Sequence, residues 1–267
     1  MGSHMYDNVI VPFDGGLELR AALAPAADLA WRCDAKLVVV NTTAASDEAS
    51  RLVLKTQAIS MSGADIDFWV DLDHEIGPAL ALAAGYRQRS VICVASRYRA
   101  VGVVRRRQVP TALPVEVFTD APAPVLTIGP EADVSRGLQL AELVVPLDGS
   151  PTGAAVLPLA AEWGARLRVA VHLVGIVGER GDGEGLSTEL EQVLDDLARR
   201  VPETSLEMVR TDDPQASLLD VLERRSNTVA MIATGGSGER AEEAIGPLAA
   251  AIVKRSSRPT VLVRASS

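Results

Sequence analysis

Two acidic turns in this chain have the composition of a site for a phosphorylated ligand. The segments VPFDGG and VPLDGS place Asp14 and Asp148 directly before glycine, at the end of a short apolar run. A glycine-rich loop, TGGSG, follows at residues 234–238. Glycine lets backbone N–H groups approach phosphate, and a helix N-terminus adds partial positive charge, so this loop suits a nucleotide. Asp148 would then face the base or the ribose, because a carboxylate repels phosphate.

The acidic turns belong to a repeat that spans the chain. Pro12 and Pro146 are 134 residues apart (146 minus 12), and the two aspartates share this spacing. Pro124 and Pro259, in the segments APVLTIG and RPTVLVR, are 135 residues apart (259 minus 124). A period this long is that of a whole domain, because arrays of small repeats have periods of roughly 20 to 50 residues. The sequence therefore predicts two copies of one domain.

The second copy alternates apolar runs with amphipathic segments. Residues 143–147 form a continuous apolar run, as in a strand that is buried on both faces. Ser150 and Pro151 suit the N-cap and first position of a helix that we expect to end at Gly164. The other expected elements are strands 167–174, 205–210, 228–233 and 260–264 and helices 187–200, 214–225 and 247–257.

The first copy follows the same plan. Strands that alternate with helices predict a parallel sheet covered on both faces, and right-handed crossovers give it the strand order 3-2-1-4-5. A ligand-sized crevice is expected at the carboxyl ends of strands 1 and 4. The predicted fold class is α/β, with two tandem doubly wound five-stranded parallel-sheet domains at residues 6–129 and 140–267. Residues 1–5 resemble a tag remnant, segment 130–140 a polar linker, and the first-copy strands lie near 8–13, 37–42, 66–71, 90–95 and 124–128.

Composition argues against several classes of function. Lys and Arg total 26 against 35 Asp and Glu, and a net charge of −9 does not suit binding of nucleic acid. No apolar run approaches the roughly 20 residues that span a membrane, and no secretion signal is visible, so we expect a cytoplasmic protein. Cys33 and Cys93 lack metal or redox spacing and are predicted to be buried. For the basic run 105–107 we expect a solvated loop, and contact with an anion or a partner stays open.

Residue types that catalyse reactions are scarce. His172 lies inside an apolar strand, where a core histidine with satisfied hydrogen bonds is expected. His74 lies in the acidic turn DLDHE, which we interpret as a solvated helix start, because a hard cation needs several oxygens at fixed geometry. Ser96, Ser150 and Ser237 have no adjacent base in sequence. We therefore predict that the protein is not an enzyme and holds no metal.

Together the repeated motifs resemble those of the universal stress proteins (UspA-like family), specifically their two-domain members. The motifs are VPxDG(S) after the first strand, a proline that begins the third helix, a glycine loop after the fourth strand, and a terminal PVLxI or PTVLV strand. The resemblance implies an adenine nucleotide alpha hydrolase-like fold whose domains pair through their last strands. It also implies either an ATP-binding or a non-binding type, of which the first carries G-x2-G-x9-G-[S/T] after strand 4.

On the second copy, this ATP-binding pattern keeps two of its four positions. Ala233 adds a methyl group where the family has glycine, and Pro247 lacks both the hydroxyl and the backbone N–H that a phosphate would use. We therefore expect no firmly bound cofactor, and ATP or AMP in the second domain stays open. The cofactor-binding residues that the resemblance implies are Asp148, Leu173, Ile232, Ala233, Gly236, Gly246 and Pro247.

The first copy departs further from the pattern. Its loop after the fourth strand reads ASRYR at 95–99, without either glycine of the first pair, and Tyr98 stands where backbone should approach phosphate. Asp14 and Thr42 are what remains of the expected pocket. We interpret this half as a non-binding copy, with another anion held by Tyr98 and the arginines as the alternative.

Three hypotheses follow. The first is a cytoplasmic, non-enzymatic stress-response protein with one degenerate ATP loop, which acts through an unidentified protein partner. The second is an adenine-nucleotide sensor or slow ATP hydrolase that uses the second domain. The third is a module whose surface, rather than its crevice, binds a partner. A pseudo-dimer through strands 124–128 and 260–264 would cover two sheet edges, and a homodimer stays open.

Overall fold

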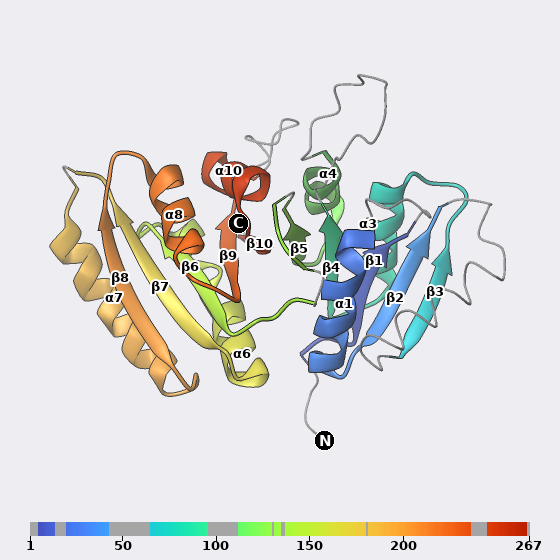
Figure 1. The fold of residues 1–267 in the computed structure, drawn as a ribbon, viewed down its shortest axis with the longest axis horizontal. Helices are drawn as coiled ribbons and strands as arrows, with labels where there is room; N and C mark the ends of the chain where they lie inside the picture. Colours follow the sequence, from blue (N-terminus) through green and yellow to red (C-terminus); the bar gives the residue numbers. More distant parts are fainter. Residues whose placement is uncertain are drawn as a thin grey trace. The chain divides into compact units, whose positions relative to one another are not determined.

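The chain divides into two compact units, Met1–Leu138 and Gln139–Ser267 (Figure 1). The structure, a computed structural model, describes residues 5–13, 20–42, 65–95, 112–129, 131–134, 137–179, 181–235 and 245–265. No helix among these residues is long and apolar enough to cross a membrane.

The first unit is a parallel sheet in the order β3-β2-β1-β4-β5. β1, β4 and β5 are buried at every position, as expected for strands covered on both faces. α1 packs against β1, β2 and β4, whereas α3 packs against α4 (Figure 1). The elements are β1 (Asn8–Pro12), α1 (Arg20–Cys33), β2 (Lys36–Asn41), β3 (Ile66–Val70), α3 (Ile76–Tyr86), β4 (Ser90–Ala95), α4 (Ala112–Asp120) and β5 (Val125–Ile128).

The second unit repeats this topology with the order β8-β7-β6-β9-β10, again parallel. The predicted order 3-2-1-4-5 and the α/β fold class are therefore confirmed. The elements are β6 (Glu142–Leu147), α5 (Pro151–Ala154), α6 (Leu157–Leu167), β7 (Ala170–Val177), α7 (Gly183–Ala198), β8 (Thr204–Arg210), α8 (Pro214–Glu223), β9 (Thr228–Thr234), α10 (Pro247–Arg255) and β10 (Thr260–Arg264).

The strand registers give an exact correspondence between the two sheets. In each unit, one row of Cα partners starts at the proline of the first strand and crosses the second and third strands. This row relates the units residue by residue, independently of loop lengths. Its members are Pro12, Val40 and Trp69 in the first unit and Pro146, Val174 and Glu207 in the second.

Several expected boundaries in the second unit are wrong by three residues or more. α7 begins at Gly183, four residues before the predicted helix 187–200, where Asp182 caps it by accepting from the N–H of Gly185. The helix expected to end at Gly164 consists of two segments, α5 and α6, because Pro158 in the first turn of α6 has no N–H to continue α5. α6 then runs past Gly164 to Leu167 and is followed by the C-cap residue Arg168, which has a left-handed φ of 54°. β7 consequently begins at Ala170, three residues later than the predicted strand 167–174.

The connecting segment contacts the first unit. Its described residues, 131–134 and 137–140, form no helix or strand. Gly137 has a φ of 87°, and the N–H of Leu138 donates to Asp28 Oδ2 of α1 at 3.2 Å. Cys33 and Cys93 are both buried, as predicted.

Candidate functional site

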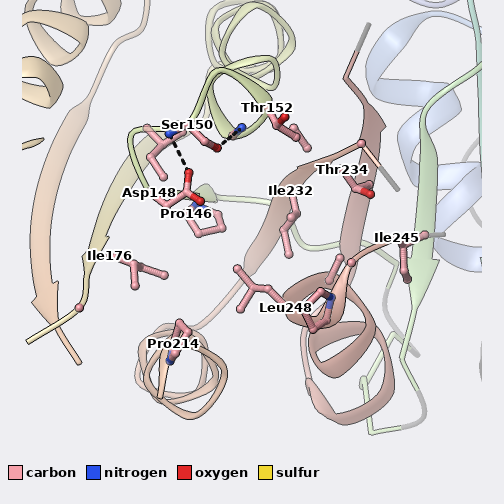
Figure 2. Close-up of a pocket in the computed structure, with 18 of the residues that line it drawn as sticks. Pro146, Asp148, Ser150, Thr152, Ile176, Pro214, Ile232, Thr234, Ile245 and Leu248 are labelled. Carbon is pink, nitrogen blue, oxygen red and sulfur yellow. Dashed lines mark hydrogen bonds between the residues drawn. The ribbon is translucent and has the colours of Figure 1, made fainter. Parts of the chain in front are cut away.

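A cavity of about 670 Å³ lies at the carboxyl ends of β6 and β9 in the second unit (Figure 2). This is the switch point of the doubly wound sheet, where helices leave on opposite faces and a crevice must open. Its walls come from the turn after β6, the ends of β7 and β9, the start of α8 and the start of α10. The predicted crevice is therefore present in the second unit.

Most of the cavity wall is apolar. Ile176 at the end of β7 and Ile232 in β9 contribute branched side chains, and Leu248 does so from α10 (Figure 2). Pro146 and Pro214 add rigid rings to the same wall. Ligand sites of this kind bury flat apolar groups and use a few polar groups for orientation.

Asp148 supplies a carboxylate at the mouth of the cavity. Its Oδ1 accepts a hydrogen bond from the N–H of Ser150 at 2.9 Å, and Ser150 Oγ accepts one from the N–H of Gly153 at 3.0 Å (Figure 2). Ser150 is thus the predicted N-cap. A side chain at position 153 would meet Asp148 Oδ1 at 2.9 Å, so glycine leaves room for the carboxylate over α5. Among the described residues Asp148 Oδ2 has no partner, and it can accept from a ligand hydroxyl.

α10 presents backbone N–H groups to the cavity. Its N-cap is Gly246, whose φ of 76° and ψ of 157° suit glycine alone, and Pro247 is its first residue. The first helical hydrogen bond of α10 joins the N–H of Ala250 to Gly246 O. The N–H groups of Leu248 and Ala249 therefore precede the ladder, and no side chain of the described residues caps them.

The other two helices that begin at the cavity are capped by their own side chains. Ser150 caps α5, and Asp213 caps α8 by accepting from the N–H of Ala216 at 3.0 Å. Because an anion favours a helix N-terminus whose donors are unsatisfied, α10 is the best place in this cavity for a phosphate.

The structure gathers most of the predicted site residues at this cavity. Leu173 is an exception and a correction: it is fully buried in the middle of β7, opposite Val145 and Leu206. Ile176 is the residue of β7 that lines the cavity, because β7 lies three residues later than the sequence pattern indicated. Gly236 lies outside the described residues. The predicted residues that line the cavity are Asp148, Ile232, Ala233, Gly246 and Pro247.

Sequence reasoning missed several lining residues. Thr211 and Asp212 follow β8, and Ile245 precedes α10. The first two could have been found, because in a doubly wound sheet the loop after the third strand also ends at the carboxyl edge. Ile245 carried no motif that would have marked it.

The corresponding crevice of the first unit lies outside the described residues. Thr42, just after β2, is described and half-buried. The interpretation of this half as a non-binding copy stays a prediction. The residues on which it and the related alternatives depend, Asp14, residues 96–99 and residues 105–107, are outside the described ranges, as is Ser237.

Comparison with solved structures identifies the fold. A universal stress protein from Archaeoglobus fulgidus DSM 4304 superposes with a TM-score of 0.71 at 16% identity, over 97% of this chain and 98% of that one. The fold is that of a tandem universal stress protein. A putative universal stress protein from Pseudomonas aeruginosa UCBPP-PA14 shares this fold with a TM-score of 0.65 at 11% identity, over 97% and 93% of the two chains.

A domain of a transporter also has a fold similar to that of this chain. The cytoplasmic domain of a prokaryotic cation chloride cotransporter matches with a TM-score of 0.60 at 11% identity, over 96% of this chain and 95% of that one. No family model and no curated protein sequence matches the chain.

The two histidines that the structure describes, His74 and His172, do not line the cavity. His172, near the amino end of β7, is 2% exposed, with Nδ1 2.7 Å from Ser205 Oγ and Nε2 3.3 Å from Glu207 Oε2. The expected core histidine with satisfied hydrogen bonds is confirmed. His74 is half-exposed before α3, with Nδ1 3.0 Å from Asp71 Oδ1.

His172 is expected to make the second unit less stable in mild acid. Burial lowers the pKa of His172, and the Arg225 charge adds to this, although Glu142 and Glu207 oppose it. The unfolded chain therefore binds a proton at a higher pH than the folded chain, so His172 contributes fully above about pH 6.5 and its contribution falls as pH decreases. The free energy of unfolding, measured with urea, should decrease between pH 7.5 and pH 5.5 by about 1 kcal/mol less in His172→Gln than in the wild type. Equal losses would contradict this.

Proposed function

We propose that this protein is a cytoplasmic, non-enzymatic regulatory protein of the universal stress type, whose second unit binds an adenine nucleotide. The observation that carries the proposal is the cavity of the second unit. It combines an apolar wall, an available carboxylate oxygen and an uncapped helix N-terminus. These three features match the base, the ribose and the phosphate of one ligand.

The apolar wall suits the base. Ile176 and Ile232 offer branched surfaces that bury a flat ring, and burial of apolar area contributes about 25 cal/mol per Å². The ribose suits Asp148, because a carboxylate accepts from two neighbouring hydroxyl groups. In this orientation the phosphates extend to α10, where the N–H groups of Leu248 and Ala249 are available.

The phosphate end of the site is weaker than the base end. Pro247 removes one N–H from the start of α10, and Gly246 supplies no side chain to the cap. The described residues that line the cavity include no lysine, arginine or histidine, so none of them neutralises a phosphate. We therefore expect the affinity to depend mainly on the base and the ribose, with ATP, ADP and AMP bound about equally.

The same lining supports binding over hydrolysis. Phosphoryl transfer relies on cations that stabilise the charge on the transferred group. The described part of the cavity offers two carboxylates, Asp148 and Asp212, and no cationic side chain. A bound nucleotide would then act as a signal read by a protein partner.

Calorimetric titration of ATP, ADP and AMP with magnesium tests the proposal. Asp148→Ala is expected to lower the affinity for all three nucleotides about tenfold, because a hydrogen bond to a charged group contributes about 1.5–3 kcal/mol. The matched control is Asp196→Ala, which removes an exposed carboxylate from α7 and should leave affinity unchanged.

Three results would contradict parts of this proposal. No heat with any nucleotide would exclude the nucleotide site, and equal affinities of the Asp148 and Asp196 variants would exclude the assigned orientation. Steady release of inorganic phosphate from ATP that is absent in Asp148→Ala would show that the second unit is a slow ATP hydrolase and not only a binding protein.

A further inference from the structure

A second candidate surface lies on the first unit, where β3 and α3 expose large apolar side chains. Tyr86 is 72% exposed and Leu82 is 37% exposed. Tyr86 stacks on Trp69 of β3, with ring centroids 5.7 Å apart and planes 27° apart. We call the side chains of Trp69, Leu82 and Tyr86 the β3–α3 face. Clustered exposed apolar groups of this kind mark sites of protein contact more often than single ones do.

A groove of about 560 Å³ continues this face toward the end of α4. Leu82 and Tyr86 of α3 line the groove together with His74, Asp120 and Pro122. The groove is therefore large enough to hold a side chain of a partner beside the stacked rings.

The second unit shows that the fold does not require apolar residues here. Trp69 and Glu207 occupy the same place in the matching strand registers. Three buried residues have the same spacing in the two helices, although α3 also buries two residues in its first turn. They are Leu80, Ala83 and Ala84 in α3 and Leu218, Val221 and Leu222 in α8. With the helices matched in this way, Leu82 corresponds to Asp220 and Tyr86 corresponds to Arg224.

The three corresponding residues of the second unit form an ion-paired surface. Arg224 Nε lies 3.1 Å from Asp220 Oδ2, and Arg224 Nη2 lies 3.3 Å from Glu207 Oε1. The same scaffold thus accepts charged side chains at every position where the first unit has Trp69, Leu82 and Tyr86. Their apolar character in the first unit needs a reason other than folding.

The charge around the β3–α3 face indicates the chemistry of its partner. Asp73, Glu75 and Asp120 are exposed carboxylates with no ion pair among the described residues. Glu116 lies against the first turn of α3, and burial together with Glu75 and Asp120 raises its pKa.

The nearby Arg87 already has two partners. Its guanidinium lies 2.7 Å from Asp67 Oδ2 and 5.6 Å from the centroid of the Trp69 ring.

We propose that the β3–α3 face docks a partner protein through a segment that presents apolar side chains flanked by lysine or arginine. The apolar side chains would cover Leu82 and the stacked rings, and the basic ones would pair with Asp73, Glu75 and Asp120. Buried aromatic anchors carry much of the affinity in such interfaces, and complementary charge gives specificity and speed of association. This docking site is separate from the nucleotide cavity and does not depend on it.

The test uses two fluorescein-labelled helical peptides that share one leucine face and carry either lysine or glutamate at every polar position. Fluorescence anisotropy should show binding of the lysine peptide, weakened by salt, and none of the glutamate peptide. Leu82→Asp combined with Tyr86→Arg reproduces the Asp220–Arg224 ion pair on α3. This double variant should bind the lysine peptide about tenfold more weakly, or weaker still. Trp31→Ala, which removes a 63% exposed aromatic side chain from α1, is the matched control and should change nothing.

Each remaining outcome overturns the proposal. Failure of the lysine peptide to bind, or equal binding to the double variant, would show that this face does not select such a partner. If Trp31→Ala weakened binding of the lysine peptide as much as the double variant does, the peptide would be binding to any exposed aromatic ring. Sedimentation that shows self-association of the wild type but not of the double variant would mean that a second copy of the chain covers the face. An unchanged thermal transition of the double variant separates all these results from misfolding.

Discussion

Replacing Pro247 with serine is expected to raise the affinity of the second unit for ATP about ten- to a hundredfold, with no change for adenosine. Serine restores an N–H and adds a hydroxyl at the first position of α10, beside the available N–H groups of Leu248 and Ala249. A hydrogen bond to a charged acceptor contributes about 1.5–3 kcal/mol, and about 1.4 kcal/mol corresponds to tenfold in affinity. Adenosine has no phosphate and gains nothing from these donors. Calorimetric titration of both ligands measures the difference.

Two matched variants separate the N–H from the hydroxyl and α10 from other helices. Pro247→Ala restores only the N–H, so its gain should be intermediate. Pro214→Ser makes the same change at the first position of α8, where Asp213 already caps the helix, and should give no gain. An equal increase in the affinity for adenosine, or an increase in the affinity of Pro214→Ser for ATP, would show that α10 is not the phosphate site.

The topology and the location of the crevice could be predicted because they depend on features that a sequence displays directly. Continuous apolar runs mark buried strands, and right-handed crossovers leave few ways to order them. The last strand was expected at 260–264, as found, and Ser150 was expected as the cap of α5. Asp148 reaches the cavity because the residue after the first strand of such a sheet always lies at this edge.

The exact registration of β7 could not be predicted. The residues from 167 to 177, LRVAVHLVGIV, are apolar almost throughout, and periodicity does not locate the ends of such a run. The left-handed conformation of Arg168 sets the start of the strand, and this is a property of tertiary packing. Leu173 was therefore assigned to the cavity in place of Ile176.

The β3–α3 face was equally hidden in the sequence. Pro12 and Pro146 differ by 134 positions, but Trp69 and Glu207 differ by 138 (207 minus 69), because the loops between them differ in length. Only the registers of the paired strands make these residues equivalent. Without that equivalence, Leu82 and Tyr86 resemble ordinary residues of an amphipathic helix.

Gly164→Ala is expected to lower the free energy of unfolding of the second unit by about 1–3 kcal/mol. Gly164 lies inside α6, and an added methyl group would lie 2.8 Å from Val171 Cγ2 and 2.9 Å from both Val201 methyl groups. Valine has few rotamers with which to make room, so backbone must shift. This cost exceeds the roughly 1 kcal/mol by which alanine favours a helix over glycine. Urea unfolding monitored by circular dichroism measures the change.

Gly85→Ala provides the control, because it makes the same change inside α3, where an added methyl group would meet no atom within 4 Å. With no clash, only the helix preference of alanine acts, and this variant should be stabilised by about 0.4–1 kcal/mol. Opposite signs for the two variants would establish that Gly164 is retained for close packing of α6 on β7. Stabilisation by both would show instead that α6 can move away from Val171 and Val201. Because α6 follows directly from the Asp148 turn and α5, such movement would also loosen the nucleotide cavity, and Gly164→Ala would then lower affinity for AMP without lowering stability.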